Sequence, residues 1–186
     1  MEDTAIIGLY WERNEQAIHE TDVKYGPYCH TIAYNILENQ EDSEECVNDT
    51  WLRAWNSMPP QRPNYLRLFL GKITRNLSLD VWKNKQAGKR GGGELALALD
   101  ELTECVADTK DIEGALQAKE LAETIERFLH TLPKRDRELF LQRYFYVCSA
   151  KELAAHYHLT ENHVAVLLSR TRKKLAAHLV KEGWSI

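Results

Sequence analysis

The sequence contains no apolar run of the roughly 20 residues that a membrane-spanning helix needs, which argues against a membrane protein. Its acidic start, Met1-Glu2-Asp3, lacks the basic and apolar segments of a signal peptide. Cysteine is scarce, with 4 in 186 residues, and no two cysteines form a CxxC pair. This spacing argues against a disulfide framework and a structural zinc site. We therefore expect a cytoplasmic protein with no membrane insertion.

The sequence also lacks the motifs that commonly mark a catalytic or metal site. It contains no glycine-rich phosphate loop, no G-x-S-x-G and no H-E-x-x-H. The carboxylate pair Glu44-Glu45 falls on the expected exterior of a helix, where nothing would adapt it to acid–base catalysis. The remaining candidate ligands match no common zinc spacing: Cys148, His156, His158 and His163. We expect a non-enzymatic protein with no catalytic residues, no cofactor and no metal.

Charge is segregated along the chain, although the net charge is only −4. Residues 1–61 carry 3 Lys or Arg against 12 Asp or Glu, whereas residues 62–90 carry 8 basic side chains and 1 acidic one. Residues 94–126 are acidic again, with 10 Asp or Glu against 2 Lys. Residues 134–182 carry 10 basic and 5 acidic side chains. Two basic modules are therefore separated by an acidic connector.

The basic modules admit two interpretations. Charge runs usually form solvated faces. In both modules, however, aromatic residues alternate with the basic ones, and this favours contact with a polyanion at two places. The aromatic residues are Tyr65, Phe69, Trp82, Phe140, Tyr144, Phe145 and Tyr146. For Trp82 itself, a place in the core or at an interface is favoured over stacking on a base.

Apolar residues recur at three- and four-residue steps, and no segment shows the sustained alternation of strands, so we predict an all-α protein. We expect Pro27 to kink or divide the second helix and Asn39 to cap the third. Val47, Trp51 and Trp55 form the apolar stripe of that third helix. The helices expected in the first half span residues 3–14, 15–37, 40–57 and 64–85.

Glycines at 88 and 91–93 mark a linker between the two halves. Leucines at 95, 97, 99 and 102 follow, and their partial alternation leaves a short strand, a docked amphipathic piece and a disordered stretch open. Pro133 suits a first helical turn, and Thr160 suits an N-cap. The helices expected in the second half span residues 111–131, 134–146, 150–157 and 161–180.

The last two of these helices, with a tight turn at His158-Leu159, have the pattern of a helix-turn-helix. Ala154 suits the close-packing position of the first helix. The second helix presents side chains that can read bases and neutralise phosphates, although such hairpins also occur in proteins that do not bind DNA. These outward residues are Asn162, His163, Ala165, Val166, Ser169, Arg170, Arg172, Lys173 and Lys174.

Three segments, in this order, resemble the extracytoplasmic-function (ECF) group of sigma-70-type RNA polymerase sigma factors. Residues 39–55 (NQEDSEECVNDTWLRAW) resemble the family's acidic helix, which ends in an aromatic-Leu-Arg-x-Trp pattern. Residues 69–80 (FLGKITRNLSLD) resemble its "lfriarNlalD" stretch. Residues 132–140 (LPKRDRELF), followed by the helix-turn-helix, resemble its C-terminal domain. Each segment alone is modest evidence for the family. The three segments in this order cover essentially the whole chain, and together they are highly specific for it.

The resemblance implies a nucleoid-associated protein that binds core RNA polymerase and directs transcription initiation at a subset of promoters. It implies a sigma-2 domain over residues 3–87, a flexible linker over 88–114 and a sigma-4 domain over 115–182. The acidic helix would bind the clamp helices of the beta-prime subunit through Asp42, Glu45, Asn48, Asp49 and Trp51. The basic helix and the loop 57–64 would melt the −10 element and hold a flipped base, through Arg62, Lys72, Arg75, Asn76 and Lys83.

The resemblance also implies that the sigma-4 domain contacts the beta flap and reads the −35 element. Ala165 and Leu167 occupy positions where the family commonly carries Lys and Arg, so we expect weaker and less salt-sensitive −35 binding. His158 replaces the usual turn glycine and is expected to adopt a positive φ. An anti-sigma protein that covers both domains is a further partner that the resemblance suggests. The residues expected at the −35 element are Asn162, His163, Val166, Ser169, Arg170, Arg172, Lys173 and Lys174.

Two other functions stay open beside the sigma factor: a free-standing helix-turn-helix regulator that does not need core polymerase, and a helical adaptor that binds only protein. An acidic helix next to a basic helix in one module favours the sigma factor, since neither alternative needs that pair. The acidic connector 94–126 is either a solubilising linker or an internal mask that folds back on a basic DNA-binding face.

Overall fold

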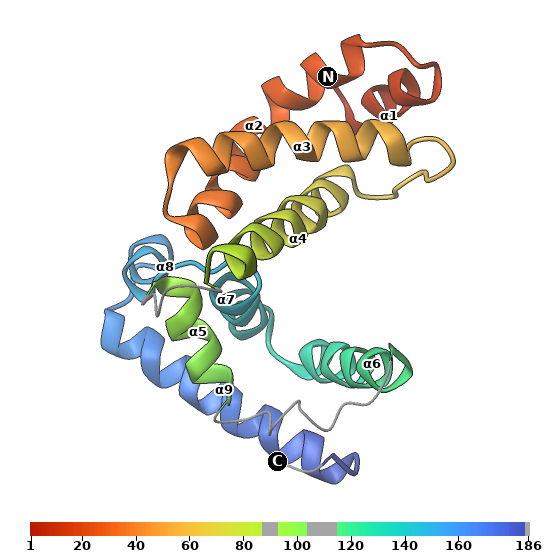
Figure 1. Cartoon of the computed structure of the whole chain (residues 1–186). Helices are drawn as coiled ribbons and strands as arrows, with labels where there is room; N and C mark the ends of the chain where they lie inside the picture. Colours follow the sequence, from red (N-terminus) through yellow and green to blue (C-terminus); the bar gives the residue numbers. More distant parts are fainter. Residues whose placement is uncertain (87–92, 104–114, 185–186) are drawn as a thin grey trace. The chain divides into compact units, whose positions relative to one another are not determined.

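The computed structural model describes residues 1–86, 93–103 and 115–184, and the regular structure in these ranges is entirely α-helical (Figure 1). The predicted all-α fold is confirmed. The chain divides into two units, residues 1–93 and 94–186, which fold around separate hydrophobic cores. In the described ranges, no helix combines the length and the apolar character that crossing a membrane requires.

The first unit is a bundle of four helices in which α2 packs against the other three. Its core centres on Ile6 and Tyr10 of the first helix, Trp51 of the third and Leu70 of the fourth. The Tyr10 hydroxyl lies 2.9 Å from the Thr21 hydroxyl, which gives this buried phenol a hydrogen-bond partner. The helices are α1 (Asp3–Trp11), α2 (Gln16–Leu37), α3 (Gln40–Ser57) and α4 (Leu66–Gln86).

Local chemistry explains where these helices begin and end. The Asn39 side chain accepts a hydrogen bond from the Asp42 backbone N–H at 3.0 Å, so the predicted cap of α3 is confirmed. α1 ends before the expected residue 14 because Arg13 has a φ of 56°, which a right-handed helix cannot accommodate. Pro27 does not divide α2, which is continuous. Buried Tyr25 and Cys29 on either side of the proline hold this helix in the core.

Small and polar side chains bring α4 close to its neighbours. The Thr50 hydroxyl of α3 donates to the Thr74 hydroxyl of α4 at 3.0 Å, inside the core. A Cβ atom at Gly71 would lie 2.5 Å from the Tyr28 hydroxyl, so only glycine fits there without displacing that ring. Phe69 and Ile73 of α4 are half-buried and pack against this core.

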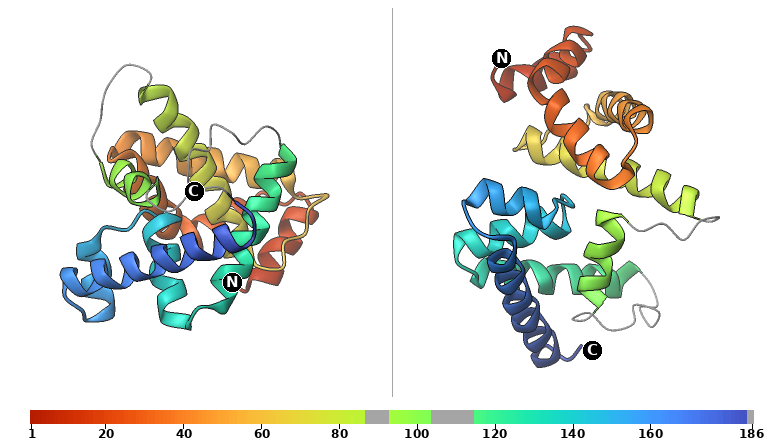
Figure 2. Two further views of the ribbon diagram at one scale, coloured as in Figure 1. Left: turned by 90° about the horizontal axis from the view of Figure 1, so that it is seen from below. Right: turned by 90° about the vertical axis from the view of Figure 1, so that its left-hand side faces the viewer.

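The second unit packs five helices around Leu139, Leu153, Val164, Leu168 and Leu175. The predicted helix 134–146 ends two residues early, at Tyr144, and a positive φ of 57° at Val147 turns the chain after it. The predicted start at residue 111 lies outside the described residues. The helices are α5 (Glu94–Thr103), α6 (Ala115–Thr131), α7 (Lys134–Tyr144), α8 (Ala150–Tyr157) and α9 (Glu161–Lys181), and Figure 2 gives two further views.

The helix-turn-helix formed by α8 and α9 is confirmed. Ser149 and Glu152 form a capping box at the start of α8, and the Thr160 hydroxyl accepts the His163 backbone N–H at 3.1 Å at the start of α9. His158 between them adopts the expected positive φ, at 54°. Ala154 of α8 is buried in the core of the second unit, which agrees with the small residue predicted there.

The leucine-rich segment after the glycines is the docked amphipathic piece, one of the three structures left open by its sequence. It forms α5, with Leu95 3% exposed and Ala98 2% exposed. Leu102 also packs against the core of the second unit. Residues 94–103 of the predicted linker therefore belong to this unit, while the limits 3–87 and 115–182 stay predictions.

Candidate functional site

The solvent-facing side of α3 is acidic. Glu44, Glu45 and Asp49 are exposed on it, together with Asn48. Val47 points the other way, into the core. An exposed cluster of carboxylates suits a basic protein surface, because charge complementarity steers association and selects the partner.

Two of the five residues predicted to contact polymerase are engaged within the first unit. Asp42 is half-buried and forms an ion pair with Lys85 of α4. Trp51 is only 6% exposed and packs in the core. The Trp51 ring packs against the core and also lines the groove between α2 and α3, so its predicted polymerase contact stays a prediction. Glu45, Asn48 and Asp49 are exposed as predicted.

A groove of about 750 Å³ lies between α2 and α3, beside the acidic face. Its apolar side chains include Ile18 and Leu52, and Leu52 is 58% exposed. Its polar side chains include Asp22 and Asn48. An apolar groove with an acidic border can accept the apolar side of a basic amphipathic helix.

A second hollow, of about 310 Å³, lies where the end of α3 and the loop after it meet α4. Phe69 supplies an aromatic ring, Gln61 and Asn76 supply amide groups, and Lys72 supplies a positive charge. The remaining lining residues are Arg53, Ser57, Ile73, Leu77 and Asp80. The structure thus brings together two of the five predicted −10 residues, Lys72 and Asn76.

The other three predicted −10 residues lie elsewhere on the first unit. The Arg62 guanidinium lies over the Trp11 ring, 5.5 Å from its centroid. Arg75 is half-buried, and burial lowers the pKa of its guanidinium. Lys83 is exposed seven residues beyond Asn76, close to two full helical turns, and so falls on the same face of α4.

The outward face of α9 is polar and basic. Asn162, His163, Val166 and Arg170 are exposed, and Ser169 is half-exposed. Lys173 and Lys174 are exposed further along the helix. Since the Thr160 cap and the helix-turn-helix geometry define the start of α9, its first turns can enter a groove of duplex DNA.

Two residues of α9, Arg172 and Leu167, lie away from its exposed face. The Arg172 side chain is 13% exposed and donates to the Tyr144 hydroxyl at 2.7 Å, so in the free protein it is held within the second unit, and its predicted −35 contact stays a prediction. Leu167 is 9% exposed and belongs to the core, so position 167 cannot supply a phosphate contact. A Lys or Arg there would bury an unpaired charge. Ala165 is exposed, so the expectation of a lost phosphate contact applies to that position alone.

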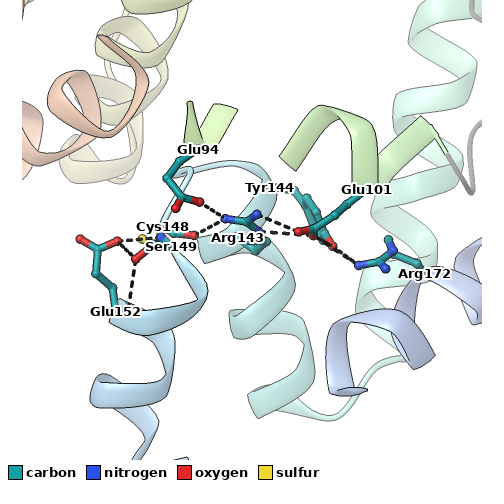
Figure 3. Close-up of polar contacts among 8 residues, drawn as sticks. All are labelled: Glu94, Glu101, Arg143, Tyr144, Cys148, Ser149, Glu152 and Arg172. Carbon is teal, nitrogen blue, oxygen red and sulfur yellow. Dashed lines mark hydrogen bonds and ion pairs between the residues drawn. The ribbon is translucent and has the colours of Figure 1, made fainter. Parts of the chain in front are cut away.

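A polar network that sequence reasoning missed joins α5 to α7 and α9 (Figure 3). The two carboxylate oxygens of Glu101 accept hydrogen bonds from Arg143 at 2.8 Å and from the Tyr144 hydroxyl at 2.8 Å. Arg172 forms an ion pair with the same carboxylate at 3.3 Å. Arg143 also donates to Glu94 at 2.7 Å and to the Cys148 carbonyl at 3.0 Å.

The electrostatics of this network keep Glu101 ionised. Burial alone would raise the pKa of the Glu101 carboxyl, but hydrogen bonds from Arg143 and Tyr144 and the charges of both arginines outweigh it, and the pKa is lowered. Burial and the hydrogen bond to this carboxylate raise the pKa of Tyr144, which therefore stays a hydrogen-bond donor.

One signal in the sequence could have revealed the network. Leu95, Ala98 and Leu102 follow the spacing of a helix face, and the alternating leucines conceal it. Glu94 and Glu101, seven residues apart, then fall on one side of that helix. Nothing local indicates that their partners lie 42 to 71 residues further along the chain.

Comparisons with known proteins identify the family. The family model for sigma-70 region 2 matches residues 23–88, and the model for sigma-70 region 4 matches residues 122–175. The two matches fall in chain order and together cover more than half of the chain. The chain belongs to the sigma-70 family. The ECF sigma factors within it are the group that the sequence resembles, and the resemblance is confirmed.

A relative from Mycolicibacterium smegmatis (strain ATCC 700084 / mc(2)155), the ECF RNA polymerase sigma factor SigE, is 23% identical over 152 residues. The match covers 82% of this chain but 57% of the relative, so the chain spans little more than half of that protein's length. The structure of CnrH in complex with the cytosolic domain of CnrY is 20% identical, with coverage of 97% of this chain and 99% of that one. Its TM-score of 0.44 is too low to support an argument about this chain.

Proposed function

We propose that this protein is an ECF sigma factor that binds core RNA polymerase and directs initiation at a subset of promoters. One observation carries the proposal: the first unit combines an exposed acidic helix, α3, with a hollow on α4 that holds aromatic, amide and cationic groups. The acidic helix suits a protein partner, and the hollow suits single-stranded nucleic acid. Such a protein works in the cytoplasm at the nucleoid and has no catalytic step of its own.

In this proposal, the acidic face of α3 binds the clamp helices of the beta-prime subunit. Glu45, Asn48 and Asp49 are the contacts that their exposure supports. The neighbouring groove, with exposed Leu52, accepts apolar side chains of the same partner. The second unit contacts the beta flap, and an anti-sigma protein that covers both units is a further proposed partner.

The hollow on α4 is the proposed place for a base flipped out of the −10 element. Extruding a base costs a few kcal/mol, and stacking on an aromatic ring returns about 1–3 kcal/mol. Phe69 offers the ring, and the Gln61 and Asn76 amides offer donors and acceptors for the base edge. Lys72 offers a charge for the adjacent phosphate. Arg62, Arg75 and Lys83 then serve the surrounding backbone rather than the flipped base.

The exposed face of α9 is the proposed reader of the −35 element. Asn162 can bind adenine through two hydrogen bonds, and Val166 can contact a thymine methyl group. His163 and Ser169 flank them. Arg170, Lys173 and Lys174 supply the phosphate contacts. With Arg172 engaged by Glu101 and Ala165 uncharged, we expect shallow salt dependence at this element.

Transcription of sheared genomic DNA by core polymerase, with and without this protein, tests the proposal directly when the RNA 5′ ends are sequenced. New starts that share two upstream elements support it. The second candidate, a free-standing regulator, would account for the helix-turn-helix but not for the acidic face of α3. It predicts DNA binding without core polymerase and no new starts with core polymerase.

Two variants test the hollow on a promoter found in this way. Lys72→Ala and Asn76→Ala should each reduce open-complex formation about tenfold, the effect of losing one base or phosphate contact. Arg67→Ala is the matched control, because this arginine is also exposed on α4 but covers the Tyr28 ring at 4.5 Å. Equal defects in all three variants would mean that the hollow is not the binding place of the flipped base.

A further inference from the structure

The Glu101 carboxylate occupies a preformed anion site on the second unit. Two guanidinium groups and one phenol, from Arg143, Arg172 and Tyr144, converge on it (Figure 3). Guanidinium groups bind planar carboxylates and phosphates in the same way, with paired N–H donors. The site is therefore built for an oxyanion, and in the free protein the oxyanion belongs to the protein itself.

The site needs an anion at all times. Arg143 is 3% exposed, and a buried guanidinium without a partner is strongly disfavoured. Glu94 and Glu101 both neutralise it, and both come from α5. Their side chains are about one-third exposed, at 35% and 32%. Solvent therefore reaches the carboxylates, and a competing anion can approach from the same side.

The helix that supplies these carboxylates is short and has an apolar outer side. α5 has 10 residues, fewer than the roughly 12–15 that a helix needs to be stable in isolation. Leu95, Ala98 and Leu102 hold it on the core, whereas Leu97 and Leu99 remain exposed. α5 thus depends on its contacts with the rest of the unit, and losing the Glu101 contacts weakens its attachment.

Arg172 lies within the basic part of α9. Arg170, Lys173 and Lys174 around it are exposed, whereas Arg172 is turned to Tyr144 and Glu101. Arg172 is two residues from Arg170 and next to Lys173, so its backbone lies within one helical turn of the cations that DNA would contact. A phosphate also suits two guanidinium groups better than a carboxylate does, since it offers more acceptor oxygens.

We propose that α5 is a displaceable internal cap. In the free protein Glu101 occupies the anion site, and in the promoter complex a DNA backbone phosphate replaces it there. This inference rests on the proposed function, because it gives α5 a regulatory role in the unit that is proposed to bind the −35 element. α5 then lowers the affinity of the free protein for DNA, and DNA binding releases it.

The test uses the full chain and a short random-sequence DNA duplex, because a phosphate contact does not depend on sequence. Glu101→Gln should make the slope of log affinity against log salt steeper by about 0.9, with affinity roughly eightfold higher near 0.1 M salt. Glu126→Gln removes the same charge from an exposed position on α6 and should change neither. Arg172→Ala should have little effect alone but cancel the gain in Glu101→Gln.

A folded Glu101→Gln protein with unchanged affinity and slope would overturn the inference. If that variant does not fold, hydrogen exchange of the unmodified protein decides. The amides of residues 94–103 should exchange faster when the duplex is bound, and unchanged protection overturns the proposal. Faster exchange with core polymerase alone would also overturn it, by assigning the site to an acidic protein group. Failure of every variant to bind DNA, even at low salt, would instead count against the proposed function.

Discussion

Two acidic helices of this chain direct their carboxylates in opposite ways. On α3, Glu44, Glu45 and Asp49 face solvent. On α5, Glu94 and Glu101 turn onto Arg143 and neighbouring groups of their own unit. In the sequence, both segments combine acidic and apolar residues. The comparison teaches that a run of acidic side chains predicts an external partner only when no buried cation of the same unit forms ion pairs with those side chains.

The largest expected effect is on stability, from neutralising the carboxylates of α5. Glu94→Gln combined with Glu101→Gln removes both charges that neutralise buried Arg143. We expect the free energy of unfolding to fall by about 2 kcal/mol, a value reduced because both glutamates are partly solvated. Denaturant unfolding measures it. The matched double change on α3, Glu44→Gln with Glu45→Gln, should stay within about 0.5 kcal/mol, and equal losses would erase the contrast.

The next effect is on binding, from reversing charges on α3. Glu45→Lys with Asp49→Lys should weaken binding to core polymerase by roughly tenfold or more, because like charges then meet across the interface. Fluorescence titration of labelled protein with core enzyme measures the affinity. Glu12→Lys, at an exposed position directly after α1, is the control for net charge. If that change weakens binding as much, the α3 face has no special role.

A smaller effect is expected from pH, because the lowered pKa of Glu101 makes its contacts sensitive to acid. The ordinary pKa of the group is 4.5, so its stabilising contribution is complete above that pH and is lost as the pH falls through the lowered value. The melting temperatures of the unmodified protein and of Glu101→Gln should therefore converge in acid and differ at neutral pH. A difference that persists unchanged at the lowest pH at which both proteins remain folded would show that ionisation of Glu101 is not its source.

The smallest effect concerns Asp42, the carboxylate of α3 that forms an ion pair with α4. Its partner Lys85 is 58% exposed, and ion pairs in contact with water contribute little. Lys85→Ala should lower the free energy of unfolding by no more than about 0.5 kcal/mol, in the same denaturant measurement. A loss as large as that of the α5 double variant would mean that α3 and α5 use their carboxylates alike.

Local sequence patterns were enough to predict the family and most of the helices, but not α5. The cap at Asn39, the cap at Thr160 and the helix 150–157 could be predicted because each depends on residues within about one helical turn. The positive φ at His158 could be predicted because this residue replaces the turn glycine of the family that the sequence resembles. The ordered motifs indicated a sigma factor because each motif is a local string.

Tertiary structure alone decided which side chains are available. Trp51 and Leu167 are taken up by hydrophobic cores, and Arg172 is held by a carboxylate 71 residues earlier in the chain. Periodicity indicates that a residue lies on one helix face or another but does not show what packs against that face. Burial and ion pairing depend on residues brought together from distant parts of the chain, and only the folded arrangement supplies those partners.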